Sequence, residues 1–397
     1  MSAYSSFNLD SCYTVASGNE RRNGNQEEMM KKIVIALVLF ALCLAPAFTQ
    51  SITEVKAVPE EKAVITEFEK YGHALLDLSI EKIMADGYEL GDTVDLKFSN
   101  GYELNGIPFF NGYYVAKGEP LLRAYPGHTY VAACVNYGKI YEIAGLSLGD
   151  TVTIRLNTKG GALDTQVLNS LKYTDKREDY ASDVVFANFR EVTTGSIAPG
   201  KLFRSCSPVS NEHGRASFAD ALIEGVGVRS VLNLADSDEE ILSYIALENY
   251  NSPYYKSLYE SGRVIALSMP IDFSSDSFAT KLAGGLKQLV EIKPETPILV
   301  HCTEGKDRAG FVTALFEALM GASKDEIIED YMLSYNNYYG ITKEHTQRYD
   351  VIVKNNIAEM LKAIEGNSAD LYKGARAFLV NHGMTDGEVD ALISALK

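Results

Sequence analysis

The sequence predicts two parts, a small all-β barrel followed by an α/β domain. Two patterns indicate this fold class. Between residues 86 and 166, short β-like runs alternate with tight-turn dipeptides such as Asn-Gly and Pro-Gly. Between residues 183 and 365, apolar strands alternate with helical stretches, which favours a sheet of mainly parallel strands. The chain has 397 residues, of which 46% are hydrophobic, and this suits two globular domains.

The composition excludes several classes of protein. There are 53 acidic against 37 basic residues, a formal net charge of -16, so we expect no nucleic-acid partner and no anionic membrane surface as partner. Five Cys are too few and too scattered for a disulfide framework or a zinc ribbon. The His residues show no metal-ligand spacing, so we predict no metal and no cofactor.

The first 47 residues read as a leader and a signal peptide. Residues 1–28 are polar and without periodicity, and translation starting at Met29 or Met30 would make them non-native. Residues 29–47 contain a basic pair, a 12-residue apolar run and a small-residue cleavage pattern. A retained membrane anchor is the alternative, although a membrane span needs about 20 residues. The sequence therefore predicts an exported protein (periplasmic, cell-surface or secreted), without stable membrane insertion after cleavage, that keeps Cys134, Cys206 and Cys302.

The elements of the first half follow in order. Residues 51–85 are expected to be helical, because Glu67, Tyr71 and Leu75 recur at spacings of four. The barrel is expected over residues 86–166, with β-like runs at 93–98, 107–110, 113–116, 129–135 and 151–156. Residues 167–182 are polar and are predicted to be a linker.

The second half shows the alternating pattern. Strands are predicted at 228–234, 264–269 and 297–300, and helices at 216–225, 278–292, 308–320 and 324–339. Ser323 and Glu326 form a capping box that opens the last of these helices. Residues 366–397 are predicted to be a C-terminal extension of two short helices around Gly383.

The most informative stretch is the loop between the strand at 297–300 and the helix at 308–320. Cys302 and Arg308 bracket five residues there. A short loop that feeds a helix N-terminus turns backbone N–H groups inward, and the helix dipole adds positive potential. Gly305 permits the unusual backbone angles of such a loop, and Arg308 offers a fork to two phosphate oxygens. The alternative is a buried structural Cys and an ordinary helix Arg.

The same field favours the thiolate form of Cys302. A thiolate beneath a bound phosphate is placed for in-line attack on phosphorus. The spacing therefore predicts nucleophilic chemistry on phosphate esters.

The segment HCTEGKDRAG, which begins at His301, resembles the signature of the cysteine-based protein-tyrosine phosphatases. It is most similar to the bacterial branch with Gly-Lys-Asp-Arg in the loop, whose members act on phosphotyrosine and often on phosphoinositides. The resemblance extends to Asn188-Phe189-Arg190, to PGKLFRS at 199–205 and to EIIEDYMLSYNNYYG at 326–340. Residues 118–154 also resemble the β-barrel of the S-adenosylmethionine hydrolase/halogenase family.

The phosphatase resemblance implies a phosphatase-type sheet with flanking helices over residues 183–365. It also implies roles for the loop. Cys302 would be the nucleophile, Arg308 the phosphate clamp, and His301 the residue that orients the loop and favours the thiolate. The phosphate would be held by Thr303, Glu304, Gly305, Lys306, Asp307 and Arg308.

Two positions depart from the family pattern. The family usually has Ser or Thr after the Arg, and this chain has Ala309, so breakdown of a phosphocysteine is expected to be slow. The usual Asp-Leu-Arg segment begins here with Asn233, so one acid is missing.

Cleavage of a phosphomonoester also needs an acid that protonates the leaving oxygen. Asp272 lies 30 residues before Cys302 and is the first candidate by resemblance to the wider superfamily. Asp307, inside the loop, is the second candidate, and Asp236, Asp238 and Asp276 follow. Helix capping is the alternative role for Asp272 and Asp276.

We therefore expect a metal-independent phosphomonoester hydrolase with a phosphocysteine intermediate, most similar to a protein-tyrosine phosphatase. Its partners would be a phosphorylated protein, a phosphoinositide or a small phosphomonoester. The alternatives are an inositol-polyphosphate phosphatase of the phytase type and a phosphate-binding module without turnover.

Overall fold

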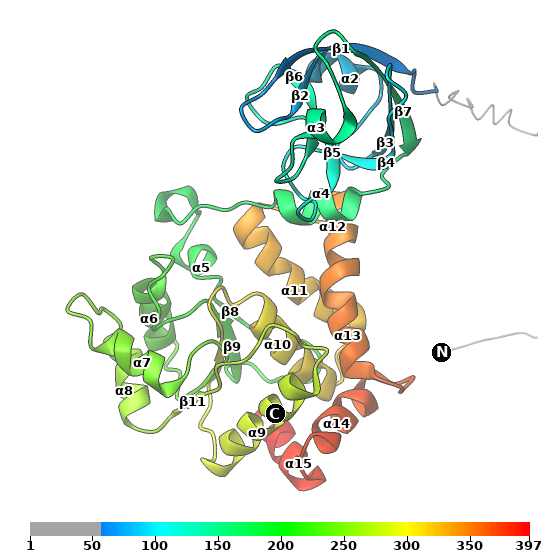
Figure 1. Cartoon of the computed structure of the whole chain (residues 1–397). Helices are drawn as coiled ribbons and strands as arrows, with labels where there is room; N and C mark the ends of the chain where they lie inside the picture. The colour runs from blue at the N-terminus through cyan, green and yellow to red at the C-terminus, as the bar shows by residue number, and fades with distance from the viewer. Residues whose placement is uncertain (1–56) are drawn as a thin grey trace, which may run out of the picture. The chain divides into compact units, whose positions relative to one another are not determined.

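The computed structural model describes residues 57–397. The predicted leader at 1–28, the predicted signal peptide at 29–47 and the start of the predicted helical segment at 51–56 lie outside the described residues. The described chain holds a closed β-barrel and an α/β domain, so the predicted fold class is confirmed (Figure 1).

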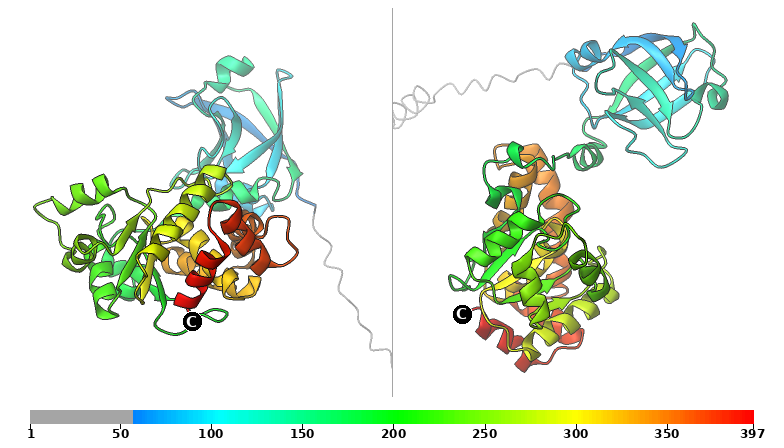
Figure 2. Two further views of the ribbon diagram at one scale, coloured as in Figure 1. Left: turned by 90° about the horizontal axis from the view of Figure 1, so that it is seen from below. Right: turned by 90° about the vertical axis from the view of Figure 1, so that its left-hand side faces the viewer.

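Seven strands form the barrel, in the order β1-β2-β6-β5-β4-β3-β7. The closed barrel is seen in the right-hand view of Figure 2. All neighbouring strands are antiparallel except β4 and β5, which are parallel. Alternate side chains point inward and form one apolar core, as expected of a small barrel. The barrel elements are β1 (Glu61–Phe68), β2 (Ala74–Ser79), α2 (Ile80–Ala85), β3 (Thr93–Phe98), β4 (Glu103–Phe110), β5 (Pro120–Arg123), β6 (Tyr130–Val135), α3 (Ile140–Ala144) and β7 (Thr151–Thr158).

The helix predicted over residues 51–85 is wrong within the described part. Residues 61–79 form β1 and β2, and only α2 is helical, so the barrel begins at Glu61 and not at residue 86. The spacing of four was misleading because Glu67 and Tyr71 are not buried, whereas Ala63 and Ile65 are buried with period two. The strand predicted at 113–116 is also wrong, since these residues form a loop.

The α/β domain is built on a five-stranded sheet of order β11-β10-β12-β9-β8. Its strands are β8 (Arg190–Glu191), β9 (Leu202–Ser205), β10 (Ser230–Asn233), β11 (Val264–Ala266) and β12 (Ile298–His301). Four strands are parallel, and only β8 is antiparallel to its neighbour. The strands predicted around β10, β11 and β12 are thus confirmed.

Helices cover both faces of this sheet (Figure 1). One face packs on α6 (Ala216–Gly225), α7 (Asp238–Ile245) and α8 (Pro253–Glu260). The other packs mainly on α9 (Asp276–Glu291), α10 (Asp307–Leu319), α11 (Lys324–Tyr339), α12 (Thr346–Ile352), a π-helical turn (Val353–Ile357), α13 (Ala358–Glu365), α14 (Leu371–Asn381) and α15 (Asp386–Ala395). The predicted capping box of α11 is present, and α14 and α15 are the predicted C-terminal pair around Gly383.

Part of the predicted linker is folded. The predicted linker overlaps the end of α4 (Leu163–Ser170) and contains a 3-10 turn (Arg177–Asp179). The helix α5 (Asp183–Phe186) follows directly after it. Val167 is buried in the core of the α/β domain, with Leu163, Leu168 and Leu171 packed against it. Apolar residues spaced three or four apart give α4 its buried face, which the surrounding polar residues obscured.

No helix within residues 57–397 is both long and apolar enough to span a membrane. The three cysteines of the same range, Cys134, Cys206 and Cys302, are buried, and none of them forms a disulfide.

Candidate active site

The predicted loop lies at the carboxyl edge of the sheet, next to its central strand. β12 ends at His301, which pairs with Asn233 of β10 and Ser205 of β9, and α10 begins at Asp307. The carboxyl ends of parallel strands are the usual ligand-binding edge of such sheets. The strand, the loop and the helix therefore occur in the predicted order and position.

The carbonyl groups of the loop are held outward by hydrogen bonds. The Thr303 carbonyl accepts from the Ser207 amide at 3.0 Å, and the Glu304 carbonyl accepts from the Tyr338 hydroxyl at 2.6 Å. Asn188 Nδ2 donates to the carbonyls of Glu304 and Gly305 at 3.1 and 3.2 Å. Arg204 Nη2 donates to those of Gly305 and Lys306 at 2.9 and 3.2 Å.

This arrangement turns the amides inward. In a planar peptide the N–H points opposite to the preceding C=O, so four consecutive outward carbonyls leave the amides of residues 304–307 facing the loop interior. Within the described chain, none of these amides donates to another residue. Together with the N-terminus of α10 they form a cradle for an anion of phosphate size.

Gly305 is required by the packing of this loop. Its φ is +68°, and a Cβ at this position would lie 2.2 Å from the Ser205 carbonyl oxygen. Both the left-handed backbone and the close approach to β9 exclude any larger residue without rearrangement.

Cys302 and Arg308 stand at the two ends of the loop. The Cys302 side chain is buried, directly after β12. Arg308 Nη2 donates to Thr303 Oγ1 at 2.9 Å, and Nη1 lies 3.3–3.4 Å from the carbonyls of Met269 and Leu234. The guanidinium is therefore held over the residue that follows the cysteine, where a phosphate oxygen would need it.

His301 is fully buried beneath the loop. Its ring lies edge-on to Tyr255, with ring centroids 5.7 Å apart. Burial lowers the pKa of His301 to about 3, so the imidazole is neutral. A neutral ring adds no positive charge beside Cys302, and the role of His301 in orienting the loop stays a prediction.

Glu304, Lys306 and Asp307 form a charged rim. Lys306 Nζ lies 2.9 Å from Glu304 Oε2 and 3.7 Å from Asp307 Oδ2, and Glu304 Oε1 accepts from the Tyr173 hydroxyl. Burial opposes ionisation of Glu304, but Lys306 and Tyr173 outweigh it and lower the pKa of this carboxyl. Burial, helped by the Glu304 charge, raises the pKa of Asp307 although Lys306 opposes it.

The two predicted acids occupy different surroundings. Asp307 and Lys306 line a cavity of about 360 Å³, which Ile271 and Phe273 also line. Asp272, between these two residues, is exposed, accepts from Ser274 N and Oγ at 3.1 and 2.6 Å, and faces another cavity beside α13 and α14. Asp307 thus lines the cavity beside the loop, whereas Asp272 lines a different cavity.

The remaining acid candidates have structural roles. Asp236 is buried and accepts from Asn233 Nδ2 at 3.0 Å, and burial raises its pKa. Asp238 begins α7 and accepts from the Tyr259 hydroxyl at 3.0 Å. Asp276 begins α9 behind the N-cap Ser275, so Ser275, and neither Asp272 nor Asp276, caps this helix.

Sequence reasoning missed the residues that hold the loop from outside. Asn188, Arg204 and Tyr338 hold its carbonyls, and Asp330 in turn holds the Arg204 and Arg190 guanidinium groups at 2.7 Å each. The signal was present, because all of these residues lie in the segments that resembled the phosphatases. Tyr173 lies outside those segments, and no pattern pointed to it.

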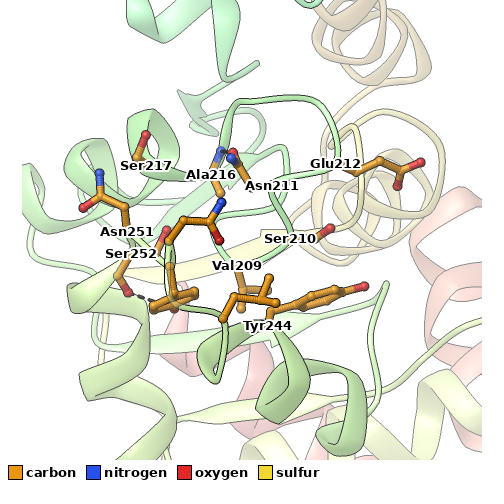
Figure 3. A pocket seen from close by; sticks show the side chains of 12 residues that line it. Val209, Ser210, Asn211, Glu212, Ala216, Ser217, Tyr244, Asn251 and Ser252 are labelled. Atoms are coloured by element: carbon orange, nitrogen blue, oxygen red, sulfur yellow. Dashed lines mark hydrogen bonds between the residues drawn. The ribbon is translucent and has the colours of Figure 1, made fainter.

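Another cavity, of about 610 Å³, lies between the loop that follows β9, the start of α6 and the α7–α8 connection (Figure 3). Its lining is mainly uncharged, with Glu212 as the one carboxylate, and Cys302 and Arg308 do not contribute to it. Across residues 57–397 there is no group of three or more His, Cys, Asp or Glu side chains arranged to hold a metal ion.

The fold and the loop define an α/β protein with an anion cradle closed by a cysteine and an arginine. A family model described as "Tyrosine phosphatase family" matches residues 186–397, more than half of the chain. The chain therefore belongs to the tyrosine phosphatase family, and the predicted resemblance is confirmed.

Curated relatives agree with this assignment. A tyrosine-protein phosphatase of Nostoc commune is 27% identical over 150 residues, which are 34% of this chain and 51% of the relative. The triple specificity protein phosphatase PtpB of Mycobacterium tuberculosis is 35% identical over 71 residues, which are 17% of this chain and 26% of the relative. The chain thus spans about half of the first relative and about a quarter of the second.

The chain resembles Pseudomonas aeruginosa TpbA with 19% identity and a TM-score of 0.23, covering 50% of this chain and 86% of TpbA. It resembles the core catalytic domain of the Saccharomyces cerevisiae PP-IP phosphatase SIW14 with 19% identity and a TM-score of 0.26, covering 45% and 90%. The resemblance of the barrel to the hydrolase/halogenase family stays a prediction.

Proposed function

We propose that this chain is a cysteine-dependent phosphomonoester hydrolase that acts on phosphotyrosine. The observation that carries the proposal is the loop itself, in which four outward carbonyls leave the amides of residues 304–307 facing inward, between Cys302 and Arg308. Preorganised amides and a fixed guanidinium stabilise the charge of a transferring phosphoryl group.

The reaction then has two steps. The Cys302 thiolate forms a bond to phosphorus while the bond to the leaving oxygen breaks, and an acid gives that oxygen its proton. Water then attacks the phosphocysteine, the same carboxylate accepts a proton from the water, and the thiolate leaves. No metal or cofactor takes part in the proposed steps.

Asp307 is the acid that the geometry favours. Its carboxyl lines the cavity beside the loop, and its raised pKa extends the pH range in which it carries a proton. Asp272 would first have to give up its two hydrogen bonds to Ser274 and turn toward the loop.

The charges around the loop favour a monophosphate on an aromatic group over an inositol polyphosphate. A polyphosphate needs several free cations, but Lys306 is shared by Glu304 and Asp307, and Arg204 is paired with Asp330. The nearby cavity is walled by Leu168, Leu171, Ile271 and Phe273, which suit an apolar or aromatic group.

A substrate panel tests this choice. Hydrolysis of a phosphotyrosine peptide, a phosphoinositide in vesicles and inositol hexakisphosphate is compared at equal phosphate concentration, with p-nitrophenyl phosphate as the activated reference. We expect the highest kcat/KM among the three biological substrates for the peptide. A preference for the hexakisphosphate would favour the phytase-type alternative, and phosphate binding without any turnover would favour the non-catalytic module.

The place of action is part of the proposal. The signal-like segment at 29–47 supports an exported enzyme that meets phosphorylated proteins or small phosphomonoesters outside the cytoplasm. Fractionation of cells that express the full chain tests it, and a product that stays in the cytoplasm at full length would contradict it.

A further inference from the structure

A tyrosine upstream of the family domain touches the catalytic loop. The family match begins at residue 186, but the Tyr173 hydroxyl donates to Glu304 Oε1. The Tyr173 ring packs on Tyr338 and Tyr339 of α11, with centroids 4.9 and 5.8 Å apart, and the Arg215 guanidinium lies 5.3 Å from its centroid. Tyr173 is therefore fixed on several sides.

The contact continues along the loop to the proposed acid. Glu304 holds Lys306 through its other carboxylate oxygen at 2.9 Å, and Lys306 Nζ lies 3.7 Å from Asp307 Oδ2. Lys306 is further held by the Tyr339 hydroxyl at 3.2 Å and lies 5.5 Å from the ring centroids of Tyr335 and Tyr339. A chain of direct contacts thus links Tyr173 to Asp307.

The same upstream segment also forms a wall of the site. Leu168 and Leu171 line the cavity of about 360 Å³ into which Lys306 and Asp307 project. One direct hydrogen bond and one shared cavity therefore place residues 168–173 beside the catalytic loop.

We propose that Tyr173 is a positioning residue that holds Glu304 in place. Glu304 then shares Lys306 with Asp307, and Asp307 keeps its proton for the leaving group. The proposal rests on the proposed function of Asp307. It extends the functional unit upstream of the family domain, into the segment that the sequence presents as a linker.

The charges around Asp307 determine the direction in which its pKa should move when Glu304 or Tyr173 is changed. The groups that face Asp307 are Glu304, Lys306 and Arg308 from the loop and Tyr331, Tyr335 and Tyr339 from α11. Those that face Glu304 are Tyr173, Lys306, Asp307, His213, Tyr338 and Tyr339. Without the Glu304 charge, the positive charge of Lys306 acts on Asp307 alone. Because a nearby cation lowers the pKa of a carboxyl, the pKa of Asp307 should fall.

The test is the pH profile of kcat/KM for a phosphotyrosine peptide. Glu304→Gln should move the alkaline limb to lower pH by about one unit. Tyr173→Phe keeps the ring and removes only the hydroxyl, and it should move the limb in the same direction by a smaller amount. Tyr254→Phe is the control, because its hydroxyl donates to the Val228 carbonyl at 2.7 Å, away from the loop.

Two outcomes would overturn the proposal. One is a Tyr173→Phe profile that coincides with those of wild type and Tyr254→Phe. The other is a uniform loss of rate with an unmoved limb, which would indicate a merely structural role. The proposed function fails if the wild-type chain shows no turnover that is lost in Cys302→Ser. In that case, carboxyl ¹³C NMR titration of Asp307 in wild type and in Tyr173→Phe still tests the role of Tyr173. Identical titration curves would refute that role.

Discussion

At the scale of single residues, the site depends on where each loop amide points. Thr303, Glu304, Gly305 and Lys306 each have a carbonyl fixed from outside the loop, and only Gly305 adopts the left-handed backbone that lets the chain pass β9. The inward direction of the loop amides therefore depends on side chains outside the loop, such as Asn188, Arg204 and Tyr338.

Gly305→Ala tests the cradle directly. The added Cβ meets the Ser205 carbonyl at 2.2 Å, so the loop must shift, and a misplacement of this kind should lower kcat/KM by on the order of 10². Gly200→Ala is the matched control, since Gly200 has a φ of +74° but nothing within 4 Å of its Cβ. Equal activities of the two variants in p-nitrophenyl phosphate hydrolysis would speak against the close-contact argument.

The identity of the acid is the second prediction. Asp307→Asn should slow hydrolysis of phosphotyrosine by about 10²–10⁴ and that of an activated aryl phosphate much less, because a good leaving group needs no proton. It should also remove the alkaline limb of the pH profile. Asp272→Asn should be close to wild type on both substrates, and the reverse pattern in steady-state rates would return the acid role to Asp272.

Ala309 leads to the third prediction. It is buried in the same core cluster as Cys302, and no hydroxyl follows Arg308. If the missing hydroxyl slows departure of the thiolate, Ala309→Ser should speed breakdown of the phosphoenzyme and diminish the burst of product seen in rapid-mixing experiments. Identical bursts and steady-state rates in both proteins would rule out this step as the slow one.

At the scale of elements, a buried ionic network joins β9, α11 and the loop. Asp330 of α11 holds Arg204 and Arg190 at 2.7 Å each, and Arg204 holds the carbonyls of Gly305 and Lys306. Burial opposes ionisation of Asp330, but the two guanidinium groups outweigh it and lower its pKa. Packing of α11 and shape of the loop are thereby coupled.

Asp330→Asn should destabilise the protein by about 3–5 kcal/mol, because it leaves two arginines without their shared carboxylate, one of them fully buried. Asp390→Asn is the matched control, since the Asp390 carboxylate is exposed and its ion pair with Arg376 should contribute little to stability. Urea unfolding measures both. Because the folded-state pKa of Asp330 is lowered, its contribution is present above the unfolded-state value of about 3.9 and is lost as pH falls through the folded-state value. Equal losses in the two variants would contradict this account.

At the scale of the whole molecule, sequence patterns predicted those features that depend on residues close together in the chain. The alternation of strands and helices predicted the sheet of the α/β domain, and the spacing of Cys302 and Arg308 predicted the loop. β1 and β2 were misread because three residues at a spacing of four imitate a helix, whereas the barrel buries alternate residues. The burial of a strand face is decided by its partners, which a single segment does not reveal.

The family resemblance marked the segments that contain the supports of the loop, but it did not show which side chains reach the loop. Asn188, Arg204 and Tyr338 lie far from the loop in sequence, and only the assembled domain brings their side chains to its carbonyls. For the same reason, the distance of Asp272 from Cys302 in sequence did not reveal that its side chain is exposed and lines a different cavity from Asp307. Tyr173 lies in a segment whose polar composition indicated a linker.

The central claim is that Cys302 becomes phosphorylated on sulfur during turnover. The most direct measurement is mass spectrometry of wild type and Cys302→Ser after rapid acid quenching with a phosphotyrosine peptide. The account predicts a phosphate adduct on Cys302 of wild type during turnover and no turnover by Cys302→Ser. The Ser variant should still bind inorganic phosphate as wild type does, because the amides of residues 304–307 and Arg308 are unchanged. Steady-state turnover by the pure Ser variant, or wild-type turnover without any adduct on Cys302, would contradict it.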